Sequence, residues 1–333
     1  MERYTVPLRD RVVAAQPNLA VFGARGEEDL PGLSTIRGEA RMSFATSETE
    51  LARIIGDADI LLGWDFRAGA LERVWPRARR LRWIHWGGAG VDAVLFPALR
   101  ESEVVLTNAR GIFDQAMAEY VLGLVLCLAK GFPRTARSQG QRRWDFRKVE
   151  TIADKRALVV GVGNIGGAIG ALLHGAGMQV MGMGRTARSD HAVFGEVHPL
   201  AELDRLLAQS DYVINITPST PETRGMFSAP RFQCMKRGAR FINVGRGDAV
   251  DEEALAAALG DGRLAGAALD VFAEEPLPEA SPLWGLDNLL VSPHMSGDVQ
   301  GSDAALISQF KDNLQRFLRG EPLENVVDKA KGY

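Results

Sequence analysis

The chain has 333 residues, of which 46% are hydrophobic and 24% charged, and its formal net charge is -3. This composition is typical of a soluble globular protein of about two domains, and the charge balance gives no reason to expect nucleic acid as a partner. The N-terminal stretch is charged and has no apolar signal core, and the longest apolar run, residues 121–129, is too short to cross a bilayer. We therefore expect a cytoplasmic protein that binds no membrane.

The two cysteines, Cys127 and Cys234, lie far apart in the chain and form no Cys-x-x-Cys motif. Both have apolar neighbours, so we expect small buried residues in a reducing compartment rather than a disulfide or metal ligands. We accordingly expect no metal site.

The first third of the chain alternates apolar runs with helical patterns. Ser47 is a plausible N-cap for a helix over 48–55. Such alternation is typical of a parallel sheet covered by helices on both faces. The strands that we predict here are 19–22, 58–64 and 81–86.

Residues 115–130 have a strong helical pattern with almost no polar face after Glu119. A helix of this kind is expected to be buried between layers. The following segment, 135–149, is polar and basic and has no clean periodicity. We interpret it as a projecting arm or a connecting segment.

The most informative motif lies in residues 157–167. An apolar run ends in Gly161-x-Gly163-x-x-Gly166, and the pattern predicts a helix over 165–174 and a strand over 179–183. In a dinucleotide-binding fold the first glycine permits a tight turn, the second lets backbone approach a pyrophosphate, and the third lets the helix pack closely. The helix N-terminus then offers N–H groups to the phosphates. The motif in this context predicts a Rossmann dinucleotide site.

The alternating pattern continues to the end of the chain. The predicted strands are 211–216, 239–244, 265–270 and 288–291, and the predicted helices are 201–209, 230–235 and 252–259. A last amphipathic helix, 301–318, is expected to return towards the first domain.

The residues after the strand at 179–183 bear on the choice of cofactor. A site for NAD carries an acidic residue at this point, which binds the ribose 2′-hydroxyl. Here Gly184 stands in that place, and Arg185, Thr186 and Arg188 follow it. An arginine can pair with a 2′-phosphate that an acid would repel. We therefore favour NADP(H) over NAD(H), which stays possible; the alternative is a solvated loop with two basic residues.

Arg246, Glu275 and His294 each follow a different predicted strand. Carboxyl ends of strands are where open α/β sheets bind their ligands. An arginine can bind a carboxylate, a histidine can exchange a proton with a carbonyl oxygen, and a carboxylate beside the histidine orients its ring and favours its protonated form. This set suits hydride transfer to a 2-oxo acid. We interpret the other histidines as structural: His85, His174, His191 and His198.

The order of these motifs resembles that of the D-isomer-specific 2-hydroxyacid dehydrogenase family along essentially the whole chain. Besides the glycine motif, the matching segments are 88–92, 107–111, 118–119, 217–225, 246–247, 270–276 and 292–294. Within the family, Gly184, Arg185 and Trp64 look most like the NADPH-preferring glyoxylate/hydroxypyruvate reductases.

The resemblance implies roles for the matching residues. Arg246 is expected to bind the substrate carboxylate and carbonyl, with His294 as the acid/base and Glu275 as its support. The backbone N–H groups of Ala89 and Gly90 are expected to bind the carboxylate. The implied cofactor-binding residues are Gly161, Gly163, Asn164, Ile165, Gly166, Arg185, Thr186, Arg188, Thr217, Pro218, Thr223, Val244 and Asp270, the last beside the nicotinamide carboxamide.

Two tryptophans are candidate substrate contacts on weaker grounds. Trp64 follows a predicted strand and could instead pack at the strand end. The family's dimers place the arm around Trp144 at or near the neighbouring subunit's substrate pocket, although simple packing of the arm is an alternative. The resemblance therefore also implies a homodimer.

The implied fold is α/β, with two Rossmann-like domains (flavodoxin-like plus dinucleotide-binding) and a cleft between them. Residues 1–105 with 297–333 would bind substrate, and 106–296 would bind NAD(P). The expected function is NADPH-dependent reduction of small 2-oxo acids, such as glyoxylate or hydroxypyruvate, to D-2-hydroxy acids. The alternatives are a dehydrogenase for bulkier 2-oxo acids and a dinucleotide-binding protein similar to the C-terminal-binding-protein corepressors.

Overall fold

The computed structural model describes residues 16–64 and 69–332, so the charged N-terminal stretch lies outside the described residues. The chain forms two compact units, Met1–Phe113 with Val299–Tyr333, and Asp114–Asp298. We expected the first break at 105/106. The structure has it later because the strand Val105–Asn108 pairs with the first sheet.

The first unit contains a parallel five-stranded sheet in the order β2-β1-β3-β4-β5. Its strands are β1 Asn18–Phe22, β2 Arg41–Ala45, β3 Ile60–Gly63, β4 Trp83–Trp86 and β5 Val105–Asn108. The central strands β3 and β4 are buried along their whole length, which a parallel sheet covered on both faces requires. The sequence pattern predicted β1, β3 and β4 and missed both edge strands, β2 and β5. The exposed polar residues of β2 weaken its apolar signal.

Helices cover both faces of this sheet. On one face lie α1 Glu48–Ile54, α2 Ala70–Val74 and α3 Pro97–Glu101. The predicted cap of α1 is confirmed, because Ser47 Oγ accepts a hydrogen bond from the Glu50 N–H at 3.3 Å. On the other face α10, Ser302–Arg319, packs against β1, β3 and β4, and the Trp83 ring stacks on Phe310 and Phe317. The C-terminal helix therefore completes the first unit, as predicted.

The second unit contains an eight-stranded sheet in the order β13-β12-β11-β10-β6-β7-β9-β8. Only β8 runs antiparallel to its neighbour among the described strands. The strands are β6 Arg156–Val160, β7 Gln179–Gly184, β8 Arg188–His191, β9 Gly195–Pro199, β10 Tyr212–Asn215, β11 Arg240–Asn243, β12 Gly266–Leu269 and β13 Leu289–Val291. The order reverses between β6 and β10, since β7 lies on one side of β6 and β10 on the other. Such a switch point is where doubly wound sheets bind ligands.

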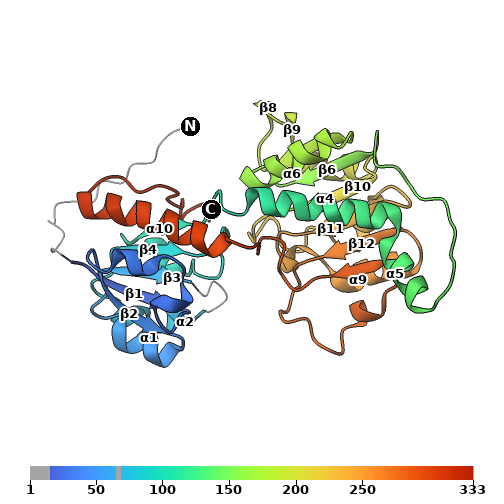
Figure 1. Cartoon of the computed structure of the whole chain (residues 1–333). Coiled ribbons are helices and arrows are strands. Elements are labelled where there is room, and N and C mark those ends of the chain that lie inside the picture. Colours follow the sequence, from blue (N-terminus) through green and yellow to red (C-terminus); the bar gives the residue numbers. More distant parts are fainter. Residues whose placement is uncertain (1–15, 65–68, 333) are drawn as a thin grey trace. The chain divides into compact units, whose positions relative to one another are not determined.

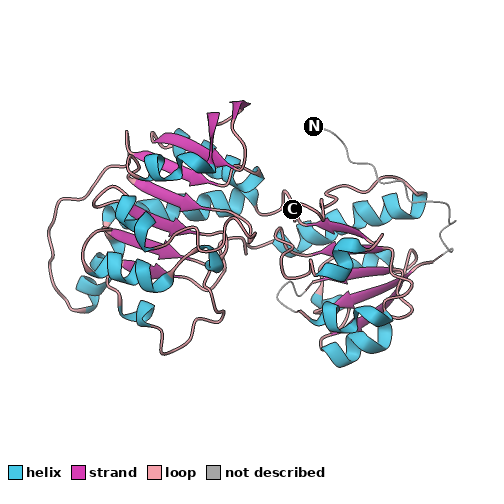
Figure 2. Cartoon of the chain, turned by 180° about the vertical axis from the view of Figure 1, so that it is seen from behind, coloured by secondary structure: helices cyan, strands magenta, loops and turns pink. Residues whose placement is uncertain are grey.

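Helices also cover both faces of the second sheet (Figures 1 and 2). On one face α4, Asp114–Lys130, lies beside α6, Asn164–Gly175, and the other face carries α7 Leu203–Leu207, α8 Ala229–Cys234 and α9 Glu252–Gly260. The prediction that α4 is buried between layers was wrong. Val121 and Val125 are buried, but Leu124 and Leu126 are half-buried and Gly123 is exposed, because α4 is an outer layer.

The segment after α4 is partly helical, which its sequence did not predict. Helix α5, Phe132–Gly140, begins after Gly131, and an extended stretch then returns to β6 along the outside of the unit (Figure 1). Arg134 pairs with Asp145, and Arg147 donates to the Gly131 carbonyl at 2.7 Å. These contacts hold the base of the arm.

No single helix in 16–64 or 69–332 is long and apolar enough to span a membrane. The helices α4 and α5 together have the length and apolar composition of a span, but they are bent by 63° relative to each other. Both cysteines are free thiols. The predicted burial was wrong for Cys234, which is exposed, and Cys127 is only half-buried. Cys234 is the last residue of α8, whose buried residue is Phe232.

Candidate active site

The glycine motif forms the turn between β6 and α6. Gly161 has a φ of 110°, which favours glycine, and a Cβ there would lie 2.7 Å from the Ile216 carbonyl oxygen. A Cβ on Gly166 would lie 1.8 Å from the Gly161 oxygen, so α6 packs directly on the turn. Beside Gly163 there is open space. The turn is therefore closely packed at Gly161 and Gly166, and its backbone is accessible at Gly163. A pyrophosphate that binds at the start of α6, at Asn164 and Ile165, requires both features.

The loop after β10 lies against this turn at the switch point of the sheet, through Ile216. Thr217 is buried and its hydroxyl donates to Asn215 Oδ1 at 2.8 Å. Thr223 Oγ1 donates to the Pro218 carbonyl at 2.6 Å, which closes the loop on itself. The structure thus brings these implied cofactor residues beside the glycine motif.

At the end of β7 the structure explains the missing acid. A Cβ on Gly184 would lie 2.9 Å from Val162 Cγ2, so a larger residue would push into the glycine turn. Arg188 is the first residue of β8 rather than part of a loop, and its Nη2 donates to the Val162 carbonyl at 3.2 Å. The hydrogen bond with Thr220, aided by the charge of Arg185, lowers the pKa of Glu222 from its ordinary value. Arg188 therefore contacts the glycine motif directly, and the charge of Arg185 acts on Glu222 in the loop after β10.

Arg246, Glu275 and His294 follow β11, β12 and β13, which are neighbours in the sheet and parallel. Their loops consequently lie at the same edge. His294 Nδ1 and Glu275 Oε2 are 2.7 Å apart, and Glu275 Oε1 accepts the Phe272 N–H at 3.0 Å. Glu275 is thereby fixed at both oxygens, one on backbone and one on the histidine ring.

The pKa of Glu275 is lowered although burial alone would raise it. The hydrogen bonds from His294 and the Phe272 amide lower it, and so do the charges of His294 and Arg246. The carboxylate therefore stays ionised at neutral pH. This pair can hold a proton for transfer to a bound carbonyl.

The Arg246 loop packs closely on the Glu275 loop. A Cβ on Gly247 would lie 1.9 Å from the Phe272 carbonyl carbon, so only glycine fits between them. Arg246 Nη1 donates to the Gly245 carbonyl at 2.8 Å. Val244 is buried at the start of this loop.

Buried polar side chains lie at the strand ends, and two of them, Asn215 and Asn243, were not predicted from the sequence. Asn215 Nδ2 donates to Asn243 Oδ1 at 2.9 Å, and Asn243 Nδ2 donates to the Arg246 carbonyl at 2.9 Å. Asp270, which the sequence singled out, directly follows β12 and is 0% exposed. The only sequence signal for the two asparagines was that each is a single polar residue at the end of an apolar run. Each of these side chains bonds the backbone of a loop that carries a candidate site residue.

The remaining predicted residues lie elsewhere in the chain. Ala89 and Gly90 are half-buried in the loop after β4 in the first unit, where Asn108 Nδ2 donates to the Ala89 carbonyl at 2.6 Å. Trp64 follows β3 in the same unit and packs, half-buried, against its core. Trp144 lies on the arm of the second unit and is 95% exposed.

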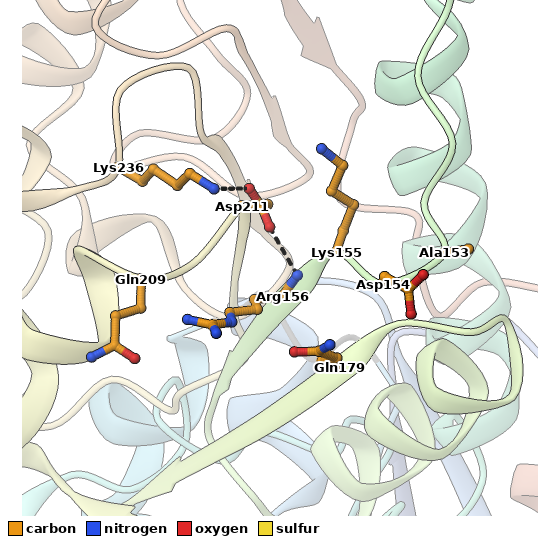
Figure 3. A pocket seen from close by; sticks show the side chains of 8 residues that line it. All are labelled: Ala153, Asp154, Lys155, Arg156, Gln179, Gln209, Asp211 and Lys236. Carbon is orange, nitrogen blue, oxygen red and sulfur yellow. Dashed lines mark hydrogen bonds and ion pairs between the residues drawn. The ribbon is translucent and has the colours of Figure 1, made fainter.

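The opposite edge of the eight-stranded sheet carries a polar surface pocket of about 400 Å³ (Figure 3). Its lining comes from the amino ends of β6, β7 and β10: Ala153, Asp154, Lys155, Arg156, Gln179, Gln209, Asp211 and Lys236. Figure 3 shows Lys236 and the Arg156 backbone directed at Asp211, at 2.6 and 2.9 Å. None of the predicted site residues lines this pocket.

Comparison with known proteins agrees with this geometry. Residues 122–296 match the family model for the NAD binding domain of D-isomer specific 2-hydroxyacid dehydrogenases. The chain is 31% identical to Escherichia coli glyoxylate/hydroxypyruvate reductase B, over 94% of this chain and 98% of that one. It is also 31% identical to a D-3-phosphoglycerate dehydrogenase of Methanocaldococcus jannaschii, over 87% of this chain and 56% of that one. The chain thus spans about half the length of several curated phosphoglycerate dehydrogenases that it matches.

Among solved structures, a D-isomer specific 2-hydroxyacid dehydrogenase of Xanthobacter autotrophicus Py2, in complex with NADPH and MES, has a TM-score of 0.83. It is 34% identical and covers 96% of this chain and 100% of its own. The predicted α/β fold of two Rossmann-like units and the use of a nicotinamide dinucleotide are thereby confirmed. The chain belongs to the D-isomer specific 2-hydroxyacid dehydrogenase family.

Proposed function

We propose that this protein is an NADPH-preferring reductase of small 2-oxo acids, such as glyoxylate or hydroxypyruvate, and forms D-2-hydroxy acids. The observation that carries the proposal is the 2.7 Å contact between His294 Nδ1 and Glu275 Oε2 beside the Arg246 loop.

The proposed reaction assigns one task to each of these residues. The glycine motif would hold NADPH, which would supply the hydride for the carbonyl carbon. Arg246 would bind the substrate carboxylate through its guanidinium fork. Because Glu275 holds Nδ1 of His294, Nε2 is the atom that donates a proton to the carbonyl oxygen. Glu275 stabilises the positive ring before the transfer.

The preference for NADPH rests on Gly184, Arg185 and Arg188. No carboxylate stands where a NAD site needs one, and a Cβ on Gly184 would lie 2.9 Å from the Val162 Cγ2 methyl. Arg185 would bind the 2′-phosphate, and Arg188, which bonds the Val162 carbonyl, would support it.

Two alternatives have specific grounds. A dehydrogenase for other 2-oxo acids, including bulkier ones, is compatible with a phosphoglycerate dehydrogenase relative at 31% identity. A dinucleotide-binding corepressor-like protein would keep Arg246, Glu275 and His294, but such proteins prefer NAD, and the arginines after Gly184 disfavour this reading.

We further propose a cytoplasmic homodimer. Apolar side chains on α4 are half-buried, and Phe132, Trp144 and Phe146 are exposed, as expected of a surface that another copy covers. The arm around Trp144 would then reach the substrate pocket of the neighbouring copy. Trp64 would either contact substrate or pack at the end of β3.

The test is steady-state oxidation of NADPH and, separately, NADH with glyoxylate, hydroxypyruvate, pyruvate and a bulky aromatic 2-oxo acid. Fast turnover of the small acids with preference for NADPH supports the proposal. Preference for the bulky acid moves the assignment to the broader dehydrogenase. Tight dinucleotide binding with no turnover of any acid contradicts a reductase and favours the binding protein.

A further inference from the structure

We propose that Asp270 is a positioning residue of the candidate active site, whose buried carboxylate holds the His294 loop in the shape that pairs His294 with Glu275. The inference deepens the proposed function and rests on it for the role of His294. Asp270 directly follows β12, whereas the His294 loop follows the neighbouring strand β13. The contact therefore joins two strand ends that lie side by side.

Asp270 bonds the loop on both sides of the histidine. Its Oδ1 accepts the Ser292 hydroxyl at 2.7 Å and the Met295 N–H at 3.0 Å. Its Oδ2 accepts the Ser296 N–H at 2.8 Å. Both oxygens are occupied, and the side chain is 0% exposed. The carboxylate thus fixes the loop directly before and after His294.

The loop has a conformation that needs such support. His294 has a φ of 53°, in the left-handed region that residues other than glycine rarely adopt. A strained backbone of this kind persists only where the surroundings hold it. A buried carboxylate is itself costly unless it is hydrogen-bonded. The three donors from the loop therefore stabilise Asp270, and Asp270 stabilises the loop.

Replacement of Asp270 by Asn isolates this role. The amide has nearly the same shape, but one of its oxygens becomes an NH₂ group, which would face an N–H or O–H donor. At least one side of the loop is then released. Loss of a charge-assisted bond predicts about tenfold to hundredfold faster amide hydrogen exchange in residues 292–296 of Asp270→Asn than in the wild type. Unchanged exchange there overturns the proposal, and this readout needs no enzymatic activity.

The kinetic readout separates positioning from cofactor binding. With a displaced His294, kcat for NADPH-dependent reduction of hydroxypyruvate falls by about 10- to 100-fold in Asp270→Asn. The Kd for NADPH is expected to stay at the wild-type value. A weakened NADPH complex with wild-type exchange in the loop would instead assign Asp270 to the cofactor and overturn the proposal.

Variants of Ser292 give a milder second test, in case Asp270→Asn fails to fold. Ser292→Ala removes one of the three donors and is expected to lower kcat less than Asp270→Asn does. Ser292→Thr keeps the hydroxyl and is expected to restore the wild-type kcat. Equal losses in the two variants contradict a role for the hydrogen bond.

Asp211→Asn is the matched control. Asp211 lies at the opposite edge of the same sheet, where its carboxylate accepts the Arg156 N–H at 2.9 Å and contacts Lys236 at 2.6 Å (Figure 3). We expect a lower Tm with unchanged kcat and unchanged exchange in 292–296. A kcat loss equal to that of Asp270→Asn overturns the proposal. If the wild type turns over no 2-oxo acid, the proposed function fails, while hydrogen exchange still decides whether Asp270 holds the loop.

Discussion

The eight-stranded sheet has a carboxyl edge, where its parallel strands end, and an amino edge, where they begin. Polar groups are used differently at these two edges. At the carboxyl edge, Asn215, Asn243 and Asp270 are fully buried and bond the side chains and backbone of neighbouring loops. At the amino edge, Lys236 and Asp211 form an ion pair with the lysine half exposed. Buried hydrogen bonds fix geometry, whereas exposed ion pairs contribute little because water screens them. The comparison predicts that changes at the carboxyl edge alter catalysis and changes at the amino edge alter stability slightly.

The largest expected effect belongs to His294. If it donates the proton, His294→Ala lowers kcat by about 10²–10⁴-fold, while Tm stays near the wild-type value. The matched control is His174→Ala, because His174 is exposed in the last turn of α6. Steady-state kinetics with hydroxypyruvate measures both. Wild-type turnover in His294→Ala would remove the proton-transfer assignment.

Two arginines flanking the same strand sharpen the contrast between the edges. Arg246 follows the carboxyl end of β11, and Arg240 opens its amino end, where it pairs with Glu150 at 2.6 Å. Arg246→Ala should lower kcat/KM by about ten- to hundredfold, with a large rise in KM, because a charged hydrogen bond to the carboxylate is lost. Arg240→Ala should leave both constants unchanged. Similar kinetic losses in the two variants would contradict the difference between the edges.

A smaller effect is expected at Arg185, which acts on the cofactor alone. Arg185→Ala should weaken NADPH binding by about tenfold, the value of one charge-assisted bond to phosphate, and leave NADH binding unchanged. Fluorescence titration with each dinucleotide measures this. An equal loss for both would reverse the cofactor preference, and Arg205→Ala, at an exposed ion pair on α7, is the control.

The contrast between buried and exposed polar groups has a counterpart in the first unit. Burial lowers the pKa of His85 to about 3 from its ordinary value of 6.5. Between these values the unfolded chain binds a proton that the folded chain does not, so stability falls as pH drops below about 6.5. The slope approaches about 1.4 kcal/mol per pH unit.

Urea unfolding between about pH 7.5 and pH 5.5 tests this effect. His85→Gln should flatten the decline in the free energy of unfolding, and His174→Gln should keep it. A decline of the wild-type size in His85→Gln would contradict the role of His85.

The sequence predicted most of the fold because parallel strands buried on both faces are apolar throughout. It missed β2, β5, β8 and β9, which lie at or near sheet edges and carry polar residues, so their pattern resembles a loop. Helix α5 was missed because most of its residues are polar and exposed. Local pattern does not show which strands a sheet leaves at its edge.

The candidate site divides in the same way. Arg246, Glu275 and His294 could be predicted because each is a chemically distinctive residue that follows an apolar strand. The buried partners Asn215 and Asn243 could not, because a polar residue at the end of an apolar run also marks an ordinary strand boundary. Their role appears only when sheet order makes β10 and β11 neighbours. Pairing between strands distant in sequence carries that information.

The most direct test of the central claim is product analysis with the wild-type enzyme, NADPH and hydroxypyruvate. Chiral chromatography should detect D-glycerate in a molar amount equal to that of the NADPH consumed. In His294→Ala, neither D-glycerate formation nor NADPH consumption should be detected. Formation of the L-isomer, or no 2-hydroxy acid product from any of the small 2-oxo acids, would contradict a D-2-hydroxyacid reductase built on His294, Glu275 and Arg246.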